Sequence, residues 1–235
     1  TGVDWDHPDL NDNIWINKNE LPTNGIDDDN NGYIDDYIGW DFVNMDANPG
    51  DDNSHGTHVA GIAAAEGNNG TGICGVAWHS KILPLKVLQS TGTGSSSNLA
   101  EAIEYAANQG ATVINMSLGS YGESLTVRNA LENAYAGTGD GLGSMLVAAA
   151  GNDHLKVSAF DLCGNYGSYP MPFYPAAYPW VLGVMAGDAG PCNGFSNWDF
   201  DGPVAYNGAN YELITYGTNI LSCKLNGEYW HKSGT

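Results

Sequence analysis

Residues 96–118 read SSNLAEAIEYAANQGATVINMSL, and this stretch predicts a helix followed directly by a strand. Its first apolar residues recur at the spacing of one helix face, at Leu99, Ala102, Ile103 and Ala106. Gly110 is the kind of residue that commonly follows the end of a helix. The run ATVINMSL after it is short and apolar, as in a buried strand. We therefore predict a helix over 96–110 and a strand over 111–118.

The alternation of helix and apolar strand continues on both sides of this stretch. Two further helices are predicted, one over 55–66 with Asn53 or Ser54 as its N-cap and one over 124–136. Three further strands are predicted over 81–88, 144–152 and 180–188. Such strands, apolar on both faces, are typical of an α/β fold with a mostly parallel sheet flanked by helices on both faces. Because no linker or repeat interrupts the pattern, we predict a single domain over residues 1–235.

The chain is strongly acidic. Its 235 residues include 27 Asp and Glu against 7 Lys and Arg, which gives a formal net charge of −20. This charge makes nucleic acids and anionic membranes poor partners. No run of 18 or more apolar residues is present, and the start of the chain lacks the pattern of a signal peptide. We therefore expect a monomer that binds neither nucleic acid nor a membrane.

The four cysteines do not have the spacing of a zinc site. Cys163 and Cys192 both lie in loop-type sequence and are candidates for a disulfide. Cys74 is predicted to be a small buried residue, a role that free cysteines often have.

Much of the negative charge lies in the first 52 residues, which contain 13 Asp. Residues 27–36 read DDDNNGYIDD and match the start of a calcium-binding loop, with Gly32 at the sharp turn. The position where such a loop normally ends on Glu holds Ile38, so the cage would have to close earlier, at Asp35 or Asp36. The predicted calcium ligands are Asp27, Asp29, Asn31, the Tyr33 carbonyl, Asp35 and Asp36. The alternative is a solvated acidic loop that binds no ion.

Three segments carry groups suited to catalysis or to peptide binding. His55 opens a predicted helix, where a neutral imidazole can act as a general base. Asn152 follows the strand VAAAG at a turn, from which its amide can donate a hydrogen bond to an oxyanion. Residues 116–120, MSLGS, end a strand and can pair with an extended peptide. His58 lies three residues after His55, but the flanking Glu of a zinc peptidase motif is missing.

Taken in order, HGTHVAG (55–61), NMSLG (115–119) and AAAGN (148–152) resemble the subtilisin-like serine proteases, the subtilases or peptidase family S8. The opening TGVDWDHPDL (1–10) and the closing SGT (233–235) resemble the segments around the family's catalytic Asp and Ser. The resemblance covers essentially the whole chain. It implies a subtilisin-type α/β fold with a parallel sheet between helices.

The resemblance also implies residue roles. His55 matches the general base and Asn152 the oxyanion-hole donor. The substrate-binding residues would be Ser117, Leu118, Gly119, Ala149, Ala150 and Gly151. Asp9 and Asn69 match side-chain ligands of a second calcium site.

The triad's other two members match positions directly before Thr1 and directly after Thr235, so the sequence is interpreted as an interior fragment that is inactive alone. The parent protein is expected to be a secreted, calcium-stabilised serine endopeptidase that acts on polypeptides. The alternative is a non-catalytic subtilase homologue that binds peptides in a calcium-dependent way.

Overall fold

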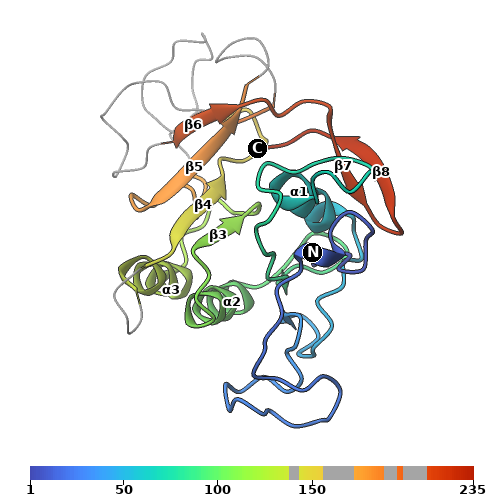
Figure 1. The fold of residues 1–235 in the computed structure, drawn as a ribbon. Coiled ribbons are helices and arrows are strands. Elements are labelled where there is room, and N and C mark those ends of the chain that lie inside the picture. Colours follow the sequence, from blue (N-terminus) through green and yellow to red (C-terminus); the bar gives the residue numbers. More distant parts are fainter. Residues whose placement is uncertain (138–142, 156–171, 188–194, 198–210) are drawn as a thin grey trace. The chain divides into compact units, whose positions relative to one another are not determined.

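The computed structural model of the protein describes residues 1–137, 143–155, 172–187, 195–197 and 211–235 (Figure 1). The chain falls into two compact units, Thr1–Ala102 with Leu221–His231, and Ile103–Ile220 with Lys232–Thr235. The single domain over residues 1–235 stays a prediction. Cys163 and Cys192, the candidates for a disulfide, lie outside the described residues.

The second unit is built on a four-stranded parallel sheet (Figure 1). Its strands are β3 (Val113–Met116), β4 (Met145–Ala149), β5 (Val181–Ala186) and β6 (Tyr211–Thr215). They lie in the order β3-β4-β5-β6, and each neighbouring pair is parallel. Leu146, Ala148 and Val181 are nearly fully buried, as expected for strands covered on both faces. The parallel α/β architecture predicted from the sequence is confirmed.

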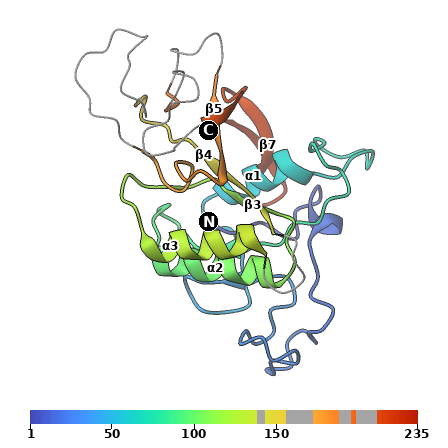
Figure 2. The ribbon, with the colours of Figure 1, turned by 90° about the vertical axis from the view of Figure 1, so that its left-hand side faces the viewer.

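Helices α2 (Ser96–Asn108) and α3 (Leu125–Ala136) lie side by side with roughly parallel axes (Figure 2). Helix α3 contacts β4 and buries one face, made of Val127, Ala130, Leu131 and Ala134. Helix α2 buries Ala102, Ile103 and Ala106, as its spacing predicts. Gly110 has a positive φ of 75°, so the chain leaves α2 in the left-handed conformation that glycine favours.

The first unit contains helix α1 (His55–Ala64) and a short 3₁₀ helix (Asn11–Asn13). Strands β1 (Trp40–Asp41) and β2 (Leu85–Lys86) form a parallel pair, and β7 (Ile220–Lys224) and β8 (Glu228–Lys232) form a separate two-stranded sheet. The core of this unit is a cluster of Val3, Leu10, Ile14, Ala60, Ala65 and Cys223.

The strand predicted over 81–88 is shorter than expected. Only Leu85 and Lys86 pair as a strand, and Ile82 makes an isolated parallel bridge to Ile14. Pro84 separates these two contacts, and because proline has no amide hydrogen it interrupts a ladder of backbone hydrogen bonds. The predicted strand therefore becomes two short contacts.

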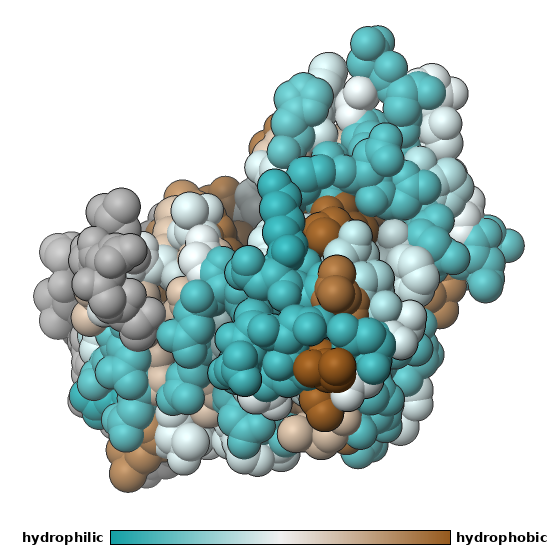
Figure 3. Space-filling view, turned by 60° about the horizontal axis from the view of Figure 1, so that its bottom comes forward, coloured by the Kyte–Doolittle hydropathy of each residue, from teal (hydrophilic) through white to brown (hydrophobic). Residues whose placement is uncertain are grey.

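The surface turned toward the viewer in Figure 3 is mostly hydrophilic, with hydrophobic residues in small separate patches. Cys74 is exposed, so its predicted burial is wrong. Its neighbour Gly75 is buried instead and donates a hydrogen bond to the Ala65 carbonyl at 2.9 Å, which turns Cys74 outward. In the described part of the chain, no helix has the length and apolar character needed to cross a membrane.

Candidate active site

His55 is the first residue of α1 and is half-buried. The residue after it, Gly56, donates from its amide to the side-chain oxygen of Thr1 at 3.0 Å. A Cβ atom at Gly56 would overlap the carbonyl oxygen of Gly2. Only glycine therefore allows residues 1–2 to pack against the start of this helix, which places the beginning of the described chain directly beside His55.

The start of α1 is capped by Asp51 and not by the predicted N-cap side chains. Ser54 occupies the cap position with φ of 70° and makes no side-chain cap bond. Instead, the amide and hydroxyl of Thr57 donate to Asp51 Oδ2 at 3.0 and 2.6 Å. Burial by itself disfavours the charged form of Asp51, but the hydrogen bonds from Thr57 and Asn53 outweigh it and lower the pKa of this carboxyl.

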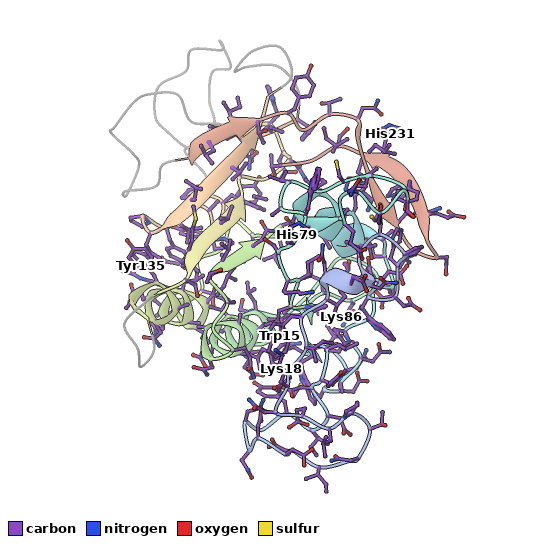
Figure 4. The ribbon with its side chains drawn as sticks, viewed as in Figure 1. Trp15, Lys18, His79, Lys86, Tyr135 and His231 are labelled. Atoms are coloured by element: carbon purple, nitrogen blue, oxygen red, sulfur yellow. The ribbon has the colours of Figure 1, made fainter. Side chains whose placement is uncertain are left out.

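Thr1 is also held by Lys86, the side chain labelled in Figure 4. Its ammonium donates to the carbonyl oxygen of Thr1 at 2.8 Å and pairs with Asp52 Oδ1 at 2.7 Å. Lys86 is 2% exposed, so this is a buried charge with its partner in place. On the other side, the Val3 amide donates to the Pro49 carbonyl at 3.0 Å. The segment beside His55 is therefore fixed by several independent contacts.

His58 is buried, and its backbone carbonyl accepts a hydrogen bond from Ser222 at 2.7 Å. Among the described residues, neither His55 nor His58 belongs to a group of three side chains that could hold a metal ion.

Asn152 lies on the turn that follows β4, beside the end of the chain. Its side-chain oxygen Oδ1 accepts hydrogen bonds from the amide and the hydroxyl of Thr235 at 3.1 and 3.2 Å. The Thr235 hydroxyl oxygen also accepts from the Gly151 amide at 3.2 Å. These bonds occupy Oδ1 of Asn152. The Nδ2 group of the same amide donates no hydrogen bond to a side chain or backbone group in the described ranges. Asn152 is exposed, so this donor can serve a bound group.

A buried asparagine that the sequence did not single out, Asn197, organises this turn. Its Oδ1 accepts from the amides of Asp153 and Leu155 at 3.2 and 2.9 Å. Its Nδ2 donates to the Ala150 carbonyl at 3.0 Å, and a Cβ atom at Gly151 would overlap this group. Asn197 lies in loop sequence with no periodicity, so no local pattern distinguishes it from the other loop asparagines.

The same turn is tied to Tyr121, which follows the end of β3. The Tyr121 hydroxyl donates to Asp153 Oδ2 at 2.6 Å and accepts from Asn197 Nδ2 at 3.0 Å. Burial and the neighbouring Asp153 carboxylate raise the pKa of Tyr121 to about 12. The Tyr121 ring also makes an edge contact with Phe173 at 5.0 Å. The chain on both sides of Asn152 is therefore rigidly connected.

The predicted peptide-binding residues occupy the carboxyl ends of β3 and β4. Ser117 is half-buried and accepts a hydrogen bond from Asn115 at 3.0 Å. Leu118 and Gly119 have no backbone hydrogen bond to another described residue, whereas Ser120 forms an antiparallel bridge with Tyr174. Unpaired backbone groups at a strand end can pair with an extended chain. Of the other predicted wall residues, Ala150 and Gly151 are buried and Ala149 is half-buried.

Asp9 and Asn69 are brought together, as the resemblance implies. Asn69 Nδ2 donates to Asp9 Oδ1 at 2.7 Å, although the two residues are 60 positions apart. The other oxygen of Asp9 accepts from the Ile73 amide at 2.8 Å and from the Tyr229 hydroxyl at 3.2 Å. Burial and the Asp9 charge raise the pKa of Tyr229 to about 12.

The four predicted carboxylate ligands of the loop 27–36 do not form one group, because only Asp27 and Asp29 belong to the same cluster of carboxylates. Asp27 and Asp29 both accept from the Asn31 amide, at 3.0 and 3.1 Å. Asp35 accepts from the amides of Asn24 and Gly25 and so caps a different turn. Three carboxylates offer oxygens within 4.8 Å of one another, and the third belongs to Glu20 and not to Asp35 or Asp36.

The remaining three ligands have other partners. The Asn31 side-chain oxygen accepts from the Tyr33 amide at 2.8 Å. Asp36 is fully buried, and its two oxygens accept from the side-chain amides of Asn17 and Asn31 at 2.9 and 2.8 Å.

Comparison with known proteins identifies the family of this chain. The family model described as "Subtilase family" matches residues 1–235. The chain is 36% identical, over its whole length, to a thermophilic serine proteinase of Bacillus sp. (strain AK1), of which it covers 46%. It is 38% identical over its whole length to halolysin of Haloferax mediterranei, of which it covers 37%. The chain thus spans less than half the length of either relative.

Among solved structures, the S41 psychrophilic protease matches the whole chain with a TM-score of 0.74 and 30% sequence identity, and the match covers 69% of that protein. Its fold agrees with the parallel sheet of this chain. The chain is a member of the subtilase family.

Proposed function

We propose that the protein containing residues 1–235 is a secreted serine endopeptidase, with His55 as the general base and Asn152 as an oxyanion-hole donor. The observation that carries the proposal is the position of the two ends of this stretch. Thr1 contacts the residue after His55, and Thr235 contacts Asn152. The family pattern expects the catalytic Asp directly before Thr1 and the nucleophilic Ser directly after Thr235. Those two positions would therefore lie beside the two residues with which they must cooperate.

The proposed reaction uses each group in a defined way. The Ser hydroxyl attacks the scissile carbonyl while His55 takes its proton and later returns it to the leaving amine. The Asp holds the imidazole of His55 in the tautomer that can accept this proton. The Asn152 Nδ2 donor stabilises the negative oxygen of the tetrahedral intermediate. The hydrogen bond between Thr235 and Asn152 supports this role, because it leaves Nδ2 as the free side of the amide.

The proposed substrates are polypeptides bound in extended form. The backbone of Leu118 and Gly119 supports this, since its hydrogen-bonding groups are not used by another described residue. The names of the matched relatives, a thermophilic serine proteinase and halolysin, favour the enzyme over a peptide-binding homologue without activity.

The test is peptidase activity of the full-length protein on casein. Replacing His55 by Ala is expected to reduce kcat to near the background rate, because the general base is lost. Asn152→Ala is expected to lower kcat by about 10²–10³, the loss measured for the equivalent donor in a subtilisin, with little change in KM. Asn129→Ala, an exposed asparagine on α3, is the control and should keep full activity. Equal activity of the His55 variant and the control would refute the proposal.

Calcium is the proposed structural cofactor. Its preferred ligands are oxygens of carboxylates, amides and carbonyls. Two groups of residues fit this preference: Asp9 with Asn69, and the carboxylates around Asp27 and Asp29. Millimolar extracellular calcium would fill even weak sites of this kind, which fits the proposed secretion. Calorimetric titration of the chelator-treated protein tests this, and the absence of any calcium-dependent heat would refute it.

A further inference from the structure

Lys86 is a buried cation that the proposed reaction does not use. Its side chain is 2% exposed and belongs to the short strand β2. Lysine is almost never fully buried unless it is paired, because removing an ammonium group from water is costly. A hydrophobic side chain of similar size would fill the same space without this cost. The charge of Lys86 is therefore the feature that needs an explanation.

The Lys86 ammonium connects two segments that meet at the start of α1. It donates to the Thr1 carbonyl oxygen at 2.8 Å and pairs with Asp52 Oδ1 at 2.7 Å. Asp52 lies three residues before His55, on the loop that leads into α1. Thr1 also contacts the helix directly, since its hydroxyl oxygen accepts from the Gly56 amide at 3.0 Å. Lys86 thus holds Thr1 and the loop before α1 in one arrangement.

Three carboxylates lie in the same region as the Lys86 charge. Asp41 is the partner of Lys86 in the β1–β2 pair. Asp51 and Asp52 belong to the loop before α1. All of these charges act on the amino group of Thr1: burial lowers the pKa of this group most, Lys86 acts in the same direction, and the three carboxylates oppose it. The electrostatic effect of Lys86 therefore reaches the backbone nitrogen of Thr1.

We propose that Lys86 is a positioning residue that fixes Thr1 against the start of α1, and that its positive charge favours the neutral form of His55. The inference rests on the proposed function, in which neutral His55 accepts a proton and a carboxylate directly before Thr1 orients the imidazole. A cation bound at the start of the helix that carries this imidazole makes its protonation less favourable. Asp52 balances the effect, because it brings a negative charge to the same place. His58, one turn further along α1, is common to all variants compared below.

The two members of the ion pair should have opposite effects on His55, which a loss of structure alone would not produce. Lys86→Met removes the positive charge and leaves Asp52, so His55 should titrate at a higher pH than in wild type. Asp52→Asn leaves the positive charge without its partner, so His55 should titrate at a lower pH. Each shift should be on the order of 0.3–1 pH unit, as for charges at intermediate distance in a protein. Lys86→Arg keeps the charge and should titrate as wild type does.

The titration of His55 can be followed by NMR through the ring C–H signals of the full-length protein. His55→Ala identifies the signal, because the signal is absent in that variant. Lys18→Met is the matched control, since it removes an exposed lysine of the same unit (Figure 4). Salt screens exposed charges, so the control should leave the midpoint within about 0.1 pH unit of wild type.

Kinetics on a peptide substrate measures the positioning effect. The acidic limb of the pH profile of kcat/KM reports the base of the free enzyme, and it should move in the same direction as the NMR midpoint. Lys86→Met should also lower kcat by about tenfold, because a displaced Thr1 misaligns the reacting groups. KM should change by less than about twofold, since a side chain that is 2% exposed makes no contact with a substrate.

The outcomes separate this inference from the peptidase proposal. Opposite shifts of the NMR midpoint in Lys86→Met and Asp52→Asn would support the inference. Unchanged midpoints, or shifts in the same direction, would overturn it, whether or not the protein cleaves a peptide. Wild-type activity no greater than that of His55→Ala would instead refute the peptidase proposal. If Lys86→Met does not fold, the comparison of Asp52→Asn with Lys86→Arg decides, because only the former is expected to shift the midpoint.

Discussion

The backbone amide of Thr235 donates to the side-chain oxygen of Asn152 at 3.1 Å, across 83 positions of sequence. This bond fixes which side of the Asn152 amide faces the chain and which side faces outward. The orientation of the proposed oxyanion donor is thus set by the backbone at Thr235, and a displaced Thr235 would misplace the Asn152 amide with it.

Asn197→Ala is expected to destabilise the protein and to lower kcat. The substitution leaves the partly buried amides of Asp153 and Leu155 without their acceptor, and we expect a loss of about 1 kcal/mol in the free energy of unfolding. Urea unfolding measures the first effect, with Asn129→Ala as the exposed control.

We expect Asn197→Ala to lower kcat by changing the position of Asn152. Adding Asn152→Ala to the Asn197 variant should then reduce kcat by less than it does in wild type, as coupled residues do. Fully additive effects would show that Asn197 supports the fold without positioning the oxyanion donor.

Gly56→Ala is expected to destabilise the protein by about 1–3 kcal/mol or more, because the added methyl group overlaps the Gly2 carbonyl. Gly122→Ala is the matched control, since a Cβ atom there meets nothing within 4 Å. Chemical unfolding of both variants measures the difference, and equal stability would contradict the close contact between residues 1–2 and α1.

Asp51→Ala should reduce stability at neutral pH by about 1 kcal/mol, the usual cost of replacing a capping side chain by alanine. The pKa of Asp51 is lowered in the folded protein, so its charged form stabilises the fold above its ordinary pKa near 3.8, and this contribution is lost as the pH falls below that value. The gap between wild type and variant should therefore narrow in acid. A gap that is constant from pH 7 to pH 2 would show that the charge of Asp51 is not involved.

Tyr121→Phe should show the opposite pH dependence. The pKa of Tyr121 is raised from 10 to about 12, so the protonated hydroxyl stabilises the fold fully below pH 10, and this contribution is lost as the pH rises toward 12. The stability difference between wild type and Tyr121→Phe should be flat up to pH 10 and then decrease. Unfolding in urea at several alkaline pH values measures it, and a difference that stays constant up to pH 12 would argue against the bond to Asp153.

The regular core of the fold could be predicted from the sequence, because its periodicity is strong. Helices α2 and α3 and strands β3, β4 and β5 lie within the predicted ranges, since each buries a continuous apolar face. Strands β6, β7 and β8 were not predicted. Residues of β8 such as Glu228 and His231 are exposed, so the run has no apolar signal.

One local signal for the β7–β8 pair was present in the sequence. Asn226 and Gly227 have φ of 65° and 69°, and this dipeptide is a common two-residue hairpin turn.

The candidate site was predictable only where a motif carries it. His55 and Asn152 stand in short family-like motifs, whereas Asn197 and Glu20 act through contacts between segments that are distant in sequence or outside the motif. Their roles depend on burial, which no local pattern expresses for a single polar residue. The calcium ligands predicted in residues 27–36 are a similar case. Their spacing grouped Asp35 with Asp27, whereas in the structure Asp35 is not part of the carboxylate cluster that contains Asp27.

Cys223 packs against α1, so its thiol can report local separation of α1 from β7. Its side chain is fully buried, and its sulfur lies only 2.8 Å from where a side chain at Gly61 would begin. Burial, together with the nearby Asp9 charge, raises the pKa of this thiol to about 12, so almost none of the reactive thiolate forms at neutral pH. Alkylating reagents would thus modify the exposed Cys74 quickly and Cys223 only when the helix separates from β7. The rate of this slow modification would measure how often the unit that contains His55 opens locally.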